Sequence, residues 1–286
     1  MPHMITIRQL LSSVGLCACL LSTSIVAMGA APSLPPGESA AKGALEKSPR
    51  HGEWVDVKVE GAPAPIKCFI VYPERKDKAP VVVVIHEVFG ETDWIRGVAD
   101  QLAAEGFIAI APDLLSGVGP NSGGTDSLGG RDNVVKAIQA LKPEAVMNDL
   151  DAVREYATQL PSSNGKSATI GFCWGGATSF AYAAHQPKLD AAVVYYGTPP
   201  GNAGLEKVQA PVMGFYGGAD NRVTSTVKPT EATMKQLGKK YTAHVYDGAG
   251  HGFLRQQDGR EGANQKATEQ AWPATMAFLK ENTEAK

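Results

Sequence analysis

Short apolar runs rich in β-branched residues alternate with helical segments along most of this chain. The clearest run, Val-Val-Val-Val-Ile at residues 81–85, has no polar position, which is typical of a parallel strand covered on both faces. Further strands are predicted at 107–111, 168–170, 191–196, 211–216 and 241–246, with helices at 94–104, 146–160, 175–185, 229–237 and 268–279, after a strand pair at 54–59 and 66–72. This alternation predicts an α/β fold, with a mostly parallel sheet and helices on both faces.

Size and charge restrict the classes of function. The chain has 286 residues, of which 43% are hydrophobic and 20% charged, and this excludes a disordered or fibrous protein. Its 27 basic and 29 acidic residues nearly cancel, so no basic surface for nucleic acid is expected. We therefore expect a monomer whose partner is a small-molecule substrate and not a nucleic acid.

The first 30 residues are expected to be a removable leader. Arg8 is their only charged residue, an apolar stretch follows from Leu10 to Met28, and small residues occupy 29–31. This order is typical of a secretory signal peptide, and a retained membrane anchor is the alternative. We expect an exported protein, periplasmic or secreted, with no stable membrane association once the leader is removed. Residues 31–51 are rich in Pro, Gly, Ala and charge and are predicted to be a flexible lead-in to a single domain at 52–286.

Two cysteines, Cys68 and Cys173, lie outside the leader. A disulfide between them is one interpretation for an oxidising compartment. Cys68 is predicted instead to be an inert core residue, because strand alternation puts it on the same face as Ile66 and Ile70. Cys173 lies in a much more specific sequence context.

One segment breaks the alternation of strands and helices. Residues 117–130 contain six glycines and no periodic apolar pattern. A long glycine-rich loop in a compact domain is usually functional or mobile, and a solvated insertion is the alternative. The sequence leaves both interpretations open.

The segment from Gly171 to Gly176, Gly-Phe-Cys-Trp-Gly-Gly, falls where a predicted strand turns into a helix. It matches the G-x-nucleophile-x-G elbow, with cysteine in the place of serine. The glycines on either side of the nucleophile remove side chains that would clash in so sharp a turn. The helix that follows directs amide N–H groups at Cys173, which favours a thiolate and later an oxyanion.

Two further motifs follow predicted strands. Asp220 ends the segment 217–220 after one strand, and His251 lies in the glycine-rich segment 247–253 after the next. Nucleophile, acid and histidine in this chain order are typical of α/β-hydrolases. His251 is predicted to take the proton of Cys173 and later to protonate a leaving group, while Asp220 orients the imidazole. Taken alone, each residue is also compatible with a turn aspartate or a loop histidine.

Motifs for cofactors and metals fail at required positions. The earlier glycine of a phosphate-binding loop ending at 165–167 is Leu160, and the second histidine of a zinc-protease motif starting at His86 is Gly90. The six histidines show no metal-ligand spacing. The sequence therefore implies no cofactor and no metal.

From residue 52 to residue 282 the sequence resembles the dienelactone hydrolase family, whose members use a cysteine nucleophile on an α/β-hydrolase fold. The matching features are the cysteine elbow, the aspartate and histidine loops, and the segments 86–90 (His-Glu-Val-Phe-Gly), 112–114 (Pro-Asp-Leu) and 195–197 (Tyr-Tyr-Gly). The resemblance implies that Glu87 contacts Cys173 and that the backbone amides of Val88 and Trp174 form the oxyanion hole.

The resemblance also implies a substrate carboxylate bound by two arginines. Arg255, four residues after the histidine, matches one of them, and Arg131, before the helix that precedes the elbow, matches the other. The tyrosine expected four residues beyond Arg131 is Val135, which leaves the acidic substrate unidentified. Trp174, where the family often has leucine, either narrows the pocket or packs as an ordinary aromatic side chain.

These residues together predict a hydrolase that opens ester or lactone bonds of a small anionic substrate through a cysteinyl thioester. The alternatives are a broad carboxylesterase or thioesterase of the same family, and a non-catalytic redox or binding protein on a hydrolase scaffold. Glu87 is predicted to hold Cys173 as a neutral thiol until an anionic substrate displaces it, because a neighbouring carboxylate disfavours a thiolate. The alternative is that Glu87 only orders the loop that carries the Val88 amide.

Overall fold

The computed structural model describes Met1, residues 33–62 and residues 64–284. The predicted leader at 1–30 therefore lies outside the described residues, apart from Met1. Within the described part of the chain, no helix has the length and apolar character needed to cross a membrane.

Eight strands form one sheet in the order β1-β2-β4-β3-β5-β6-β7-β8. From β4 to β8 all neighbours are parallel, while β2 is antiparallel to both β1 and β4. This architecture confirms the predicted α/β fold with a mostly parallel sheet. The strands are β1 (Gly52–Val57), β2 (Ile66–Val71), β3 (Ala79–Ile85), β4 (Ile108–Pro112), β5 (Ser163–Phe172), β6 (Ala191–Tyr195), β7 (Val212–Gly217) and β8 (Tyr241–Tyr246).

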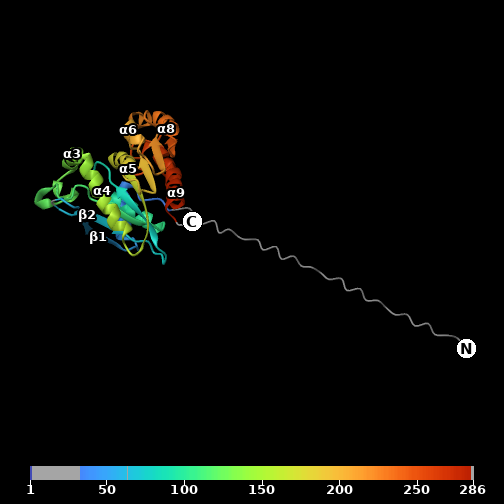
Figure 1. The fold of residues 1–286 in the computed structure, drawn as a ribbon, viewed down its shortest axis with the longest axis horizontal. Coiled ribbons are helices and arrows are strands. Elements are labelled where there is room, and N and C mark those ends of the chain that lie inside the picture. The colour runs from blue at the N-terminus through green and yellow to red at the C-terminus, as the bar shows by residue number, and fades with distance from the viewer. Residues whose placement is uncertain (2–32, 63, 285–286) are drawn as a thin grey trace. The chain divides into compact units, whose positions relative to one another are not determined.

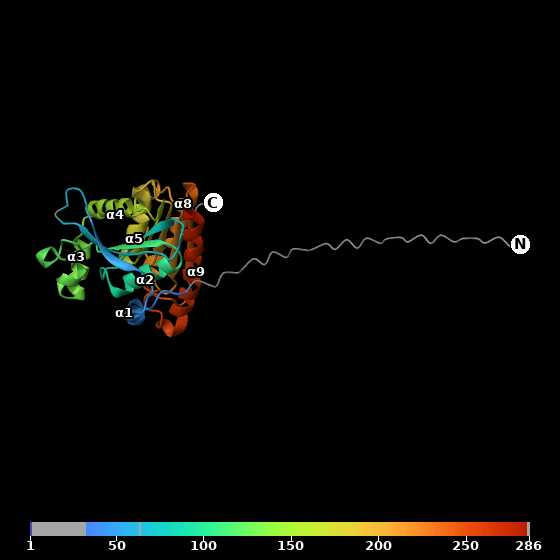
Figure 2. The ribbon, with the colours of Figure 1, turned by 90° about the horizontal axis from the view of Figure 1, so that it is seen from below.

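Helices cover both faces of the sheet, and Figure 2 shows α4 and α5 on one side with α1 and α2 on the other. One hydrophobic cluster joins the sheet to α2 (Asp93–Ala104) and α9 (Ala263–Thr283). The other joins it to α4 (Pro143–Thr158), α5 (Trp174–His185) and α8 (Val227–Gln236), which are labelled in Figure 1. The remaining α-helices are α1 (Ala41–Glu46), α3 (Arg131–Ala140), α6 (Asn202–Leu205) and α7 (Asn221–Thr224).

Strand β3 shows why the apolar run at 81–85 constrains the fold. All seven of its residues are buried. Val82 and Val84 belong to the cluster under α2 and α9, whereas Val81 and Val83 belong to the cluster under α4 and α5. A strand with both faces in a core needs apolar side chains at every position.

The flexible lead-in predicted for residues 31–51 is corrected by the structure. Within its described part, a 3₁₀ turn at Glu38–Ala40 leads into α1, and Ala41 is completely buried. Gly97 of α2 has no side chain, which lets Pro36 approach so closely that a Cβ at Gly97 would lie 2.9 Å from the proline ring. The segment packs on α2 because its apolar residues Pro36 and Ala41 lie against the space left by Gly97. Amino-acid composition does not reveal such a contact.

The secondary structure also departs from the prediction at other places, among them β5 and α3. Strand β5 covers 163–172, a longer range than the predicted 168–170, and α3 at 131–140 was not predicted. Helix α3 has only two fully buried side chains, Val134 and Ile138, so its apolar face is too narrow to give a clear pattern.

The glycine-rich segment 117–130 is tied to the end of β4. The carboxylate of Asp113 accepts hydrogen bonds from the Thr125 amide and hydroxyl, both at 2.7 Å. The Thr125 hydroxyl also accepts a hydrogen bond from the amide of Glu91 at 3.1 Å. Two 3₁₀ turns, Pro120–Ser122 and Thr125–Leu128, give the segment local structure. It therefore contacts the segment 86–91 and leads directly into α3.

Candidate active site

Cys173 occupies the sharp turn between β5 and α5. Its backbone has φ 55° and ψ −113°, a conformation that non-glycine residues rarely adopt. Such strain persists only where the surrounding structure enforces it, and it concentrates at functional sites. Here the Cys173 amide donates to the carbonyl of Tyr195 at 3.0 Å, and the cysteine carbonyl accepts from the Ala177 amide at 3.1 Å. The turn is thus held by hydrogen bonds on both sides.

The two glycines of the elbow are required by close backbone contacts. A Cβ at Gly171 would lie 1.9 Å from the carbonyl oxygen of Gly175. A Cβ at Gly175 would lie 2.3 Å from the carbonyl oxygens of both Ile85 and His86. The start of α5 can therefore rest against the end of β3 only without side chains at these positions.

Several groups act in opposite directions on the pKa of the Cys173 thiol. Burial, and then the charge of Glu87, raise its pKa above the usual value for a cysteine. Hydrogen bonds from the amides of Trp174 and Val88, and the charge of Arg222, act in the opposite direction and lower the pKa. The first two effects prevail, so the resting group is a neutral thiol.

His251 and Asp220 lie at the ends of β8 and β7 and are paired. Nδ1 of His251 lies 2.6 Å from Oδ2 of Asp220. The Asp220 side chain is 9% exposed and that of His251 is 33% exposed, so the acid is covered while the imidazole reaches solvent. Among the described residues, the thiol of Cys173 makes no hydrogen bond to this imidazole.

Tyr196 packs against His251, although the sequence indicated no role for it. Its ring centre is 5.1 Å from that of His251, and its backbone has a positive φ of 43°. Its hydroxyl is buried and has no hydrogen-bond partner among the described residues. Burial, followed by the charge of Glu87, raises the pKa of Tyr196, so the phenol stays protonated. A buried donor without a partner at this place is available to a bound substrate.

The carboxylate of Glu87 is paired with Arg255. Oε2 of Glu87 lies 2.6 Å from Nε of Arg255, although the N–H is not directed at that oxygen and the contact is an ion pair. Burial raises the pKa of Glu87 to about 7, against the lowering effect of Arg255. Both side chains are almost fully buried. Glu87 thus lies close enough to influence the thiol electrostatically while its carboxylate contacts the arginine.

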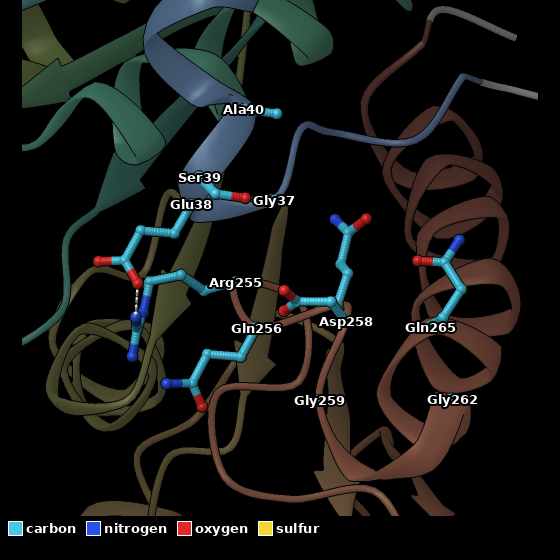
Figure 3. Close-up of a pocket in the computed structure, with 11 residues that line it drawn as sticks. Gly37, Glu38, Ser39, Ala40, Arg255, Gln256, Asp258, Gly259, Gly262 and Gln265 are labelled. Atoms are coloured by element: carbon cyan, nitrogen blue, oxygen red, sulfur yellow. Dashed lines mark hydrogen bonds and ion pairs between the residues drawn. The ribbon is translucent and has the colours of Figure 1, made fainter.

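The two arginines expected to bind a carboxylate lie around one aromatic ring. The Cζ atom of Arg131 is 3.5 Å from the ring centre of Phe89, and that of Arg255 is 5.0 Å from the same centre. The carboxylate of Glu38 contacts both guanidinium groups, with Oε2 on Nη1 of Arg255 and Oε1 4.0 Å from Nη2 of Arg131. Figure 3 shows the contact between Glu38 and Arg255.

The glycine-rich loop brings Arg131 to this place. Arg131 is the first residue of α3, directly after the loop. Thr125 anchors the loop to Asp113 and also packs on Gly90, where a Cβ would lie 2.3 Å from its hydroxyl. The loop is therefore fixed against the segment that carries Glu87 and Phe89.

Trp174 packs as part of the core beside the elbow. Its ring is stacked on that of His86 with 5.6 Å between ring centres, and His86 is completely buried. Trp174 also borders a cavity of about 260 Å³ that is lined mainly by apolar side chains, among them Leu141, Met147 and Pro199. The ring thus contributes both to packing and to the wall of a cavity.

Cys68 lies inside the sheet and away from these groups. It is completely buried, in the same cluster as Ile66 and Ile70, as the strand alternation predicted. Burial raises the pKa of its thiol well above the usual value, so the group is inert at neutral pH. Cys68 and Cys173 are both free thiols. The described residues also hold no cluster of three or more His, Cys, Asp or Glu side chains suited to a metal ion.

Sequence reasoning did not find Glu38. Glu38 lies in the segment predicted to be flexible, and 217 residues separate it from its partner Arg255. No periodicity or motif marks such a contact, because a single exposed glutamate in a polar segment is unremarkable by itself.

Comparison with known proteins identifies the family of this chain. Residues 66–283 match the dienelactone hydrolase family. The carboxymethylenebutenolidase of Pseudomonas putida is 34% identical over 194 residues, which cover 65% of this chain and 80% of that protein. The crystal structure of a "putative dienelactone hydrolase" from Klebsiella pneumoniae has a TM-score of 0.70 and 26% identity, covering 80% of this chain and 98% of that one. The chain therefore belongs to the dienelactone hydrolase family, on an α/β-hydrolase fold, and is a hydrolase of ester or lactone bonds.

Proposed function

We propose that the chain hydrolyses esters or lactones with Cys173 as nucleophile, His251 as general base and acid, and Asp220 as the residue that orients the imidazole. The observation that supports this most is the strained elbow, which places Cys173 directly before α5 while an Asp–His pair lies at neighbouring strand ends. The missing contact between thiol and imidazole does not oppose the proposal, because catalytic hydrogen bonds are often long before substrate binds.

The proposed reaction has two halves. His251 accepts the thiol proton, the sulfur of Cys173 attacks the carbonyl carbon, and the electron pair of the carbonyl moves onto its oxygen. The tetrahedral intermediate collapses to a thioester, and the alkoxide leaves with the proton from the imidazolium. Water then loses a proton to His251 and attacks the thioester, which releases the acid and returns the proton to the thiolate of Cys173.

The amides of Val88 and Trp174 are proposed to stabilise the oxyanion. Both lower the pKa of the Cys173 thiol, which supports their position beside the place where the reacting carbonyl must lie. Preorganised donors of this kind typically contribute factors of about 10²–10³ to the rate. They need no reorientation during the reaction, because backbone geometry fixes them.

We further propose that the substrate is small and anionic, with a carboxylate bound by Arg255 and Arg131. The support is the position of both guanidinium groups beside Phe89 and close to Glu87, which itself affects the thiol. A planar guanidinium binds a carboxylate with two donors and so orients the substrate as well as holding it. A function as a redox sensor is less well supported, since a sensor thiol needs a lowered pKa and that of Cys173 is raised.

Trapping the thioester tests the nucleophile. When the protein is mixed with an aryl acetate and quenched in acid, we expect acetylation on the peptide that contains Cys173. Cys173→Ala should lose both the adduct and turnover, while the matched variant Cys68→Ala should keep both. An adduct on another residue, or turnover that survives in Cys173→Ala, would contradict the proposal.

The charge of Glu87 is expected to restrain the thiol. Glu87 becomes charged as pH rises through its pKa of about 7, so its repulsion of a thiolate is present above that pH and fades below it. Glu87→Gln should therefore speed alkylation of Cys173 by iodoacetamide about threefold to tenfold near pH 8. The difference should shrink near pH 6, where the wild-type carboxyl is mostly protonated. Initial rates of alkylation across this range provide the measurement.

Glu91→Gln is the matched control for this experiment. Glu91 is also buried, also paired with an arginine, Arg96, and also has a raised pKa, of about 8. It is not among the groups that most affect the pKa of Cys173, so its variant should alkylate like the wild type. If Glu87→Gln leaves alkylation unchanged and only lowers turnover, Glu87 acts by ordering the Val88 loop.

A further inference from the structure

Glu38 contacts both arginines that are proposed to bind the substrate. We propose that its carboxylate is a built-in occupant of the anion-binding site, so that a substrate carboxylate must displace Glu38 before it can bind. This inference rests on the proposed function, because it assigns a regulatory and specificity-determining residue to the same site.

The geometry of Glu38 is that of a bound carboxylate. One of its oxygens contacts Nη1 of Arg255 and the other lies 4.0 Å from Nη2 of Arg131. Its carboxylate therefore bridges the two guanidinium groups, as a substrate carboxylate would. The Glu38 side chain is 48% exposed and that of Arg255 is only 8% exposed. The glutamate thus covers the arginine from the solvent side and is itself free to swing outward.

The backbone around Glu38 is fixed, so the contact is part of the fold. The amide of Glu38 donates to the carbonyl of Arg255 at 2.9 Å, and the side-chain amide of Gln257 donates to the carbonyl of Pro35 at 2.9 Å. Completely buried Ala41 anchors the following turn on α2. Displacement therefore needs only a rotation of the Glu38 side chain, while the segment 35–41 stays in place.

Space for the displaced side chain is present next to the arginine. An open pocket of about 730 Å³ is lined by Glu38, Arg255, Gln256 and Asp258, together with small residues of the segment 37–40 (Figure 3). Cys173, Asp220 and His251 do not line this pocket, so we do not assign it to the reacting part of the substrate. Because Glu38 and Arg255 both line it, the pocket borders the proposed anion site and offers the Glu38 side chain room to move.

The Glu38 carboxylate lowers the net positive charge of the anion-binding site. Arg131 and Arg255 carry two positive charges, which Glu38 and ionised Glu87 balance. When Glu38 turns away or is neutralised, the site regains one positive charge and attracts a carboxylate more strongly. Glu38 also lies outside residues 66–283 that match the family, so the family match by itself does not predict this contact.

Kinetics on matched substrates test the proposal. Glu38→Gln keeps the shape of the side chain and removes its charge, so kcat/KM for an aryl ester bearing a carboxylate should rise about tenfold. The same value for the neutral aryl acetate should stay within about twofold. Benzoate, used as an inhibitor of aryl acetate hydrolysis, should bind about tenfold more tightly to this variant.

Control variants separate this inference from the proposed function. Glu46→Gln removes another carboxylate from the same N-terminal segment and should change neither substrate preference nor benzoate binding. Glu38→Ala should reproduce the effect of Glu38→Gln with an unchanged melting temperature, which excludes a change of folding. Equal kinetics of Glu38→Gln and wild type would overturn the inference. If Arg255→Ala still lowers turnover of the anionic ester selectively in that case, the proposed anionic substrate stands; if it does not, that proposal fails too.

Discussion

Replacing His251 by alanine is expected to lower kcat/KM for an aryl ester by about 10²–10⁴-fold, the usual effect of losing general acid–base catalysis. The effect should be large here because burial and Glu87 raise the pKa of Cys173. A thiol that is neutral at rest attacks a carbonyl poorly until a base takes its proton. Steady-state hydrolysis of the neutral aryl acetate near pH 7 is the measurement, since that substrate does not depend on the arginine pair.

His185→Ala is the matched control for this variant. His185 is also paired with an aspartate, with Nε2 2.8 Å from Oδ2 of Asp151, but it lies at the far end of α5 from Cys173. At about 1.5 Å per residue, that end is roughly 18 Å from the elbow. Its variant should hydrolyse the ester at the wild-type rate. A loss below about threefold in His251→Ala would exclude this residue as the general base.

Replacing Gly175 by alanine is expected to destabilise the protein, although alanine normally favours a helix by about 1 kcal/mol over glycine. The added Cβ would lie 2.3 Å from the carbonyl oxygens of Ile85 and His86, both in backbone that cannot move without disturbing β3. Overpacking of this kind costs about 1–3 kcal/mol or more, so the clash outweighs the helix preference. We expect a net loss of up to about 2 kcal/mol and a fall in melting temperature of up to about 8 °C.

Thermal unfolding followed by circular dichroism measures this effect. Gly43→Ala is the control, because Gly43 lies within α1 and a Cβ there would meet no atom within 4 Å. Its melting temperature should equal or slightly exceed that of the wild type. Esterase activity of folded Gly175→Ala should also fall, since α5 carries the amide of Trp174. A Gly175→Ala protein that melts like the wild type would mean that the elbow is less tightly packed than the structure shows.

Much of the fold could be predicted from short-range patterns. The run at 81–85 required a strand with two buried faces, and β3 contributes alternate residues to two cores. The elbow glycines could be interpreted in the same way, because a sharp turn excludes side chains whatever surrounds it. These features depend on residues that are close together in the sequence. Their conformational preferences can therefore be recognised from the sequence alone.

Weak local patterns explain what could not be predicted. Helix α3 buries too few side chains to show a period, and the segment 33–51 looked unstructured because polar residues separate its apolar ones. In both cases tertiary contacts supply the order: Thr125 holds the loop before α3, and burial of Ala41 holds the segment before β1. A prediction based on local preference cannot include partners that lie far along the chain.

The sequence by itself determined the fold class, the place of Cys173 at a turn and the positions of Asp220 and His251 after strands. Only the tertiary structure decided that Glu38 bridges Arg131 and Arg255, that Glu87 pairs with Arg255, and that Tyr196 presents a buried hydroxyl without a partner among the described residues. The physical reason is separation along the chain. Side chains as far apart in the sequence as Glu38 and Arg255 come into contact only after the sheet and its helices have packed. An ion pair of this kind produces no periodic pattern in the sequence from which it could be predicted.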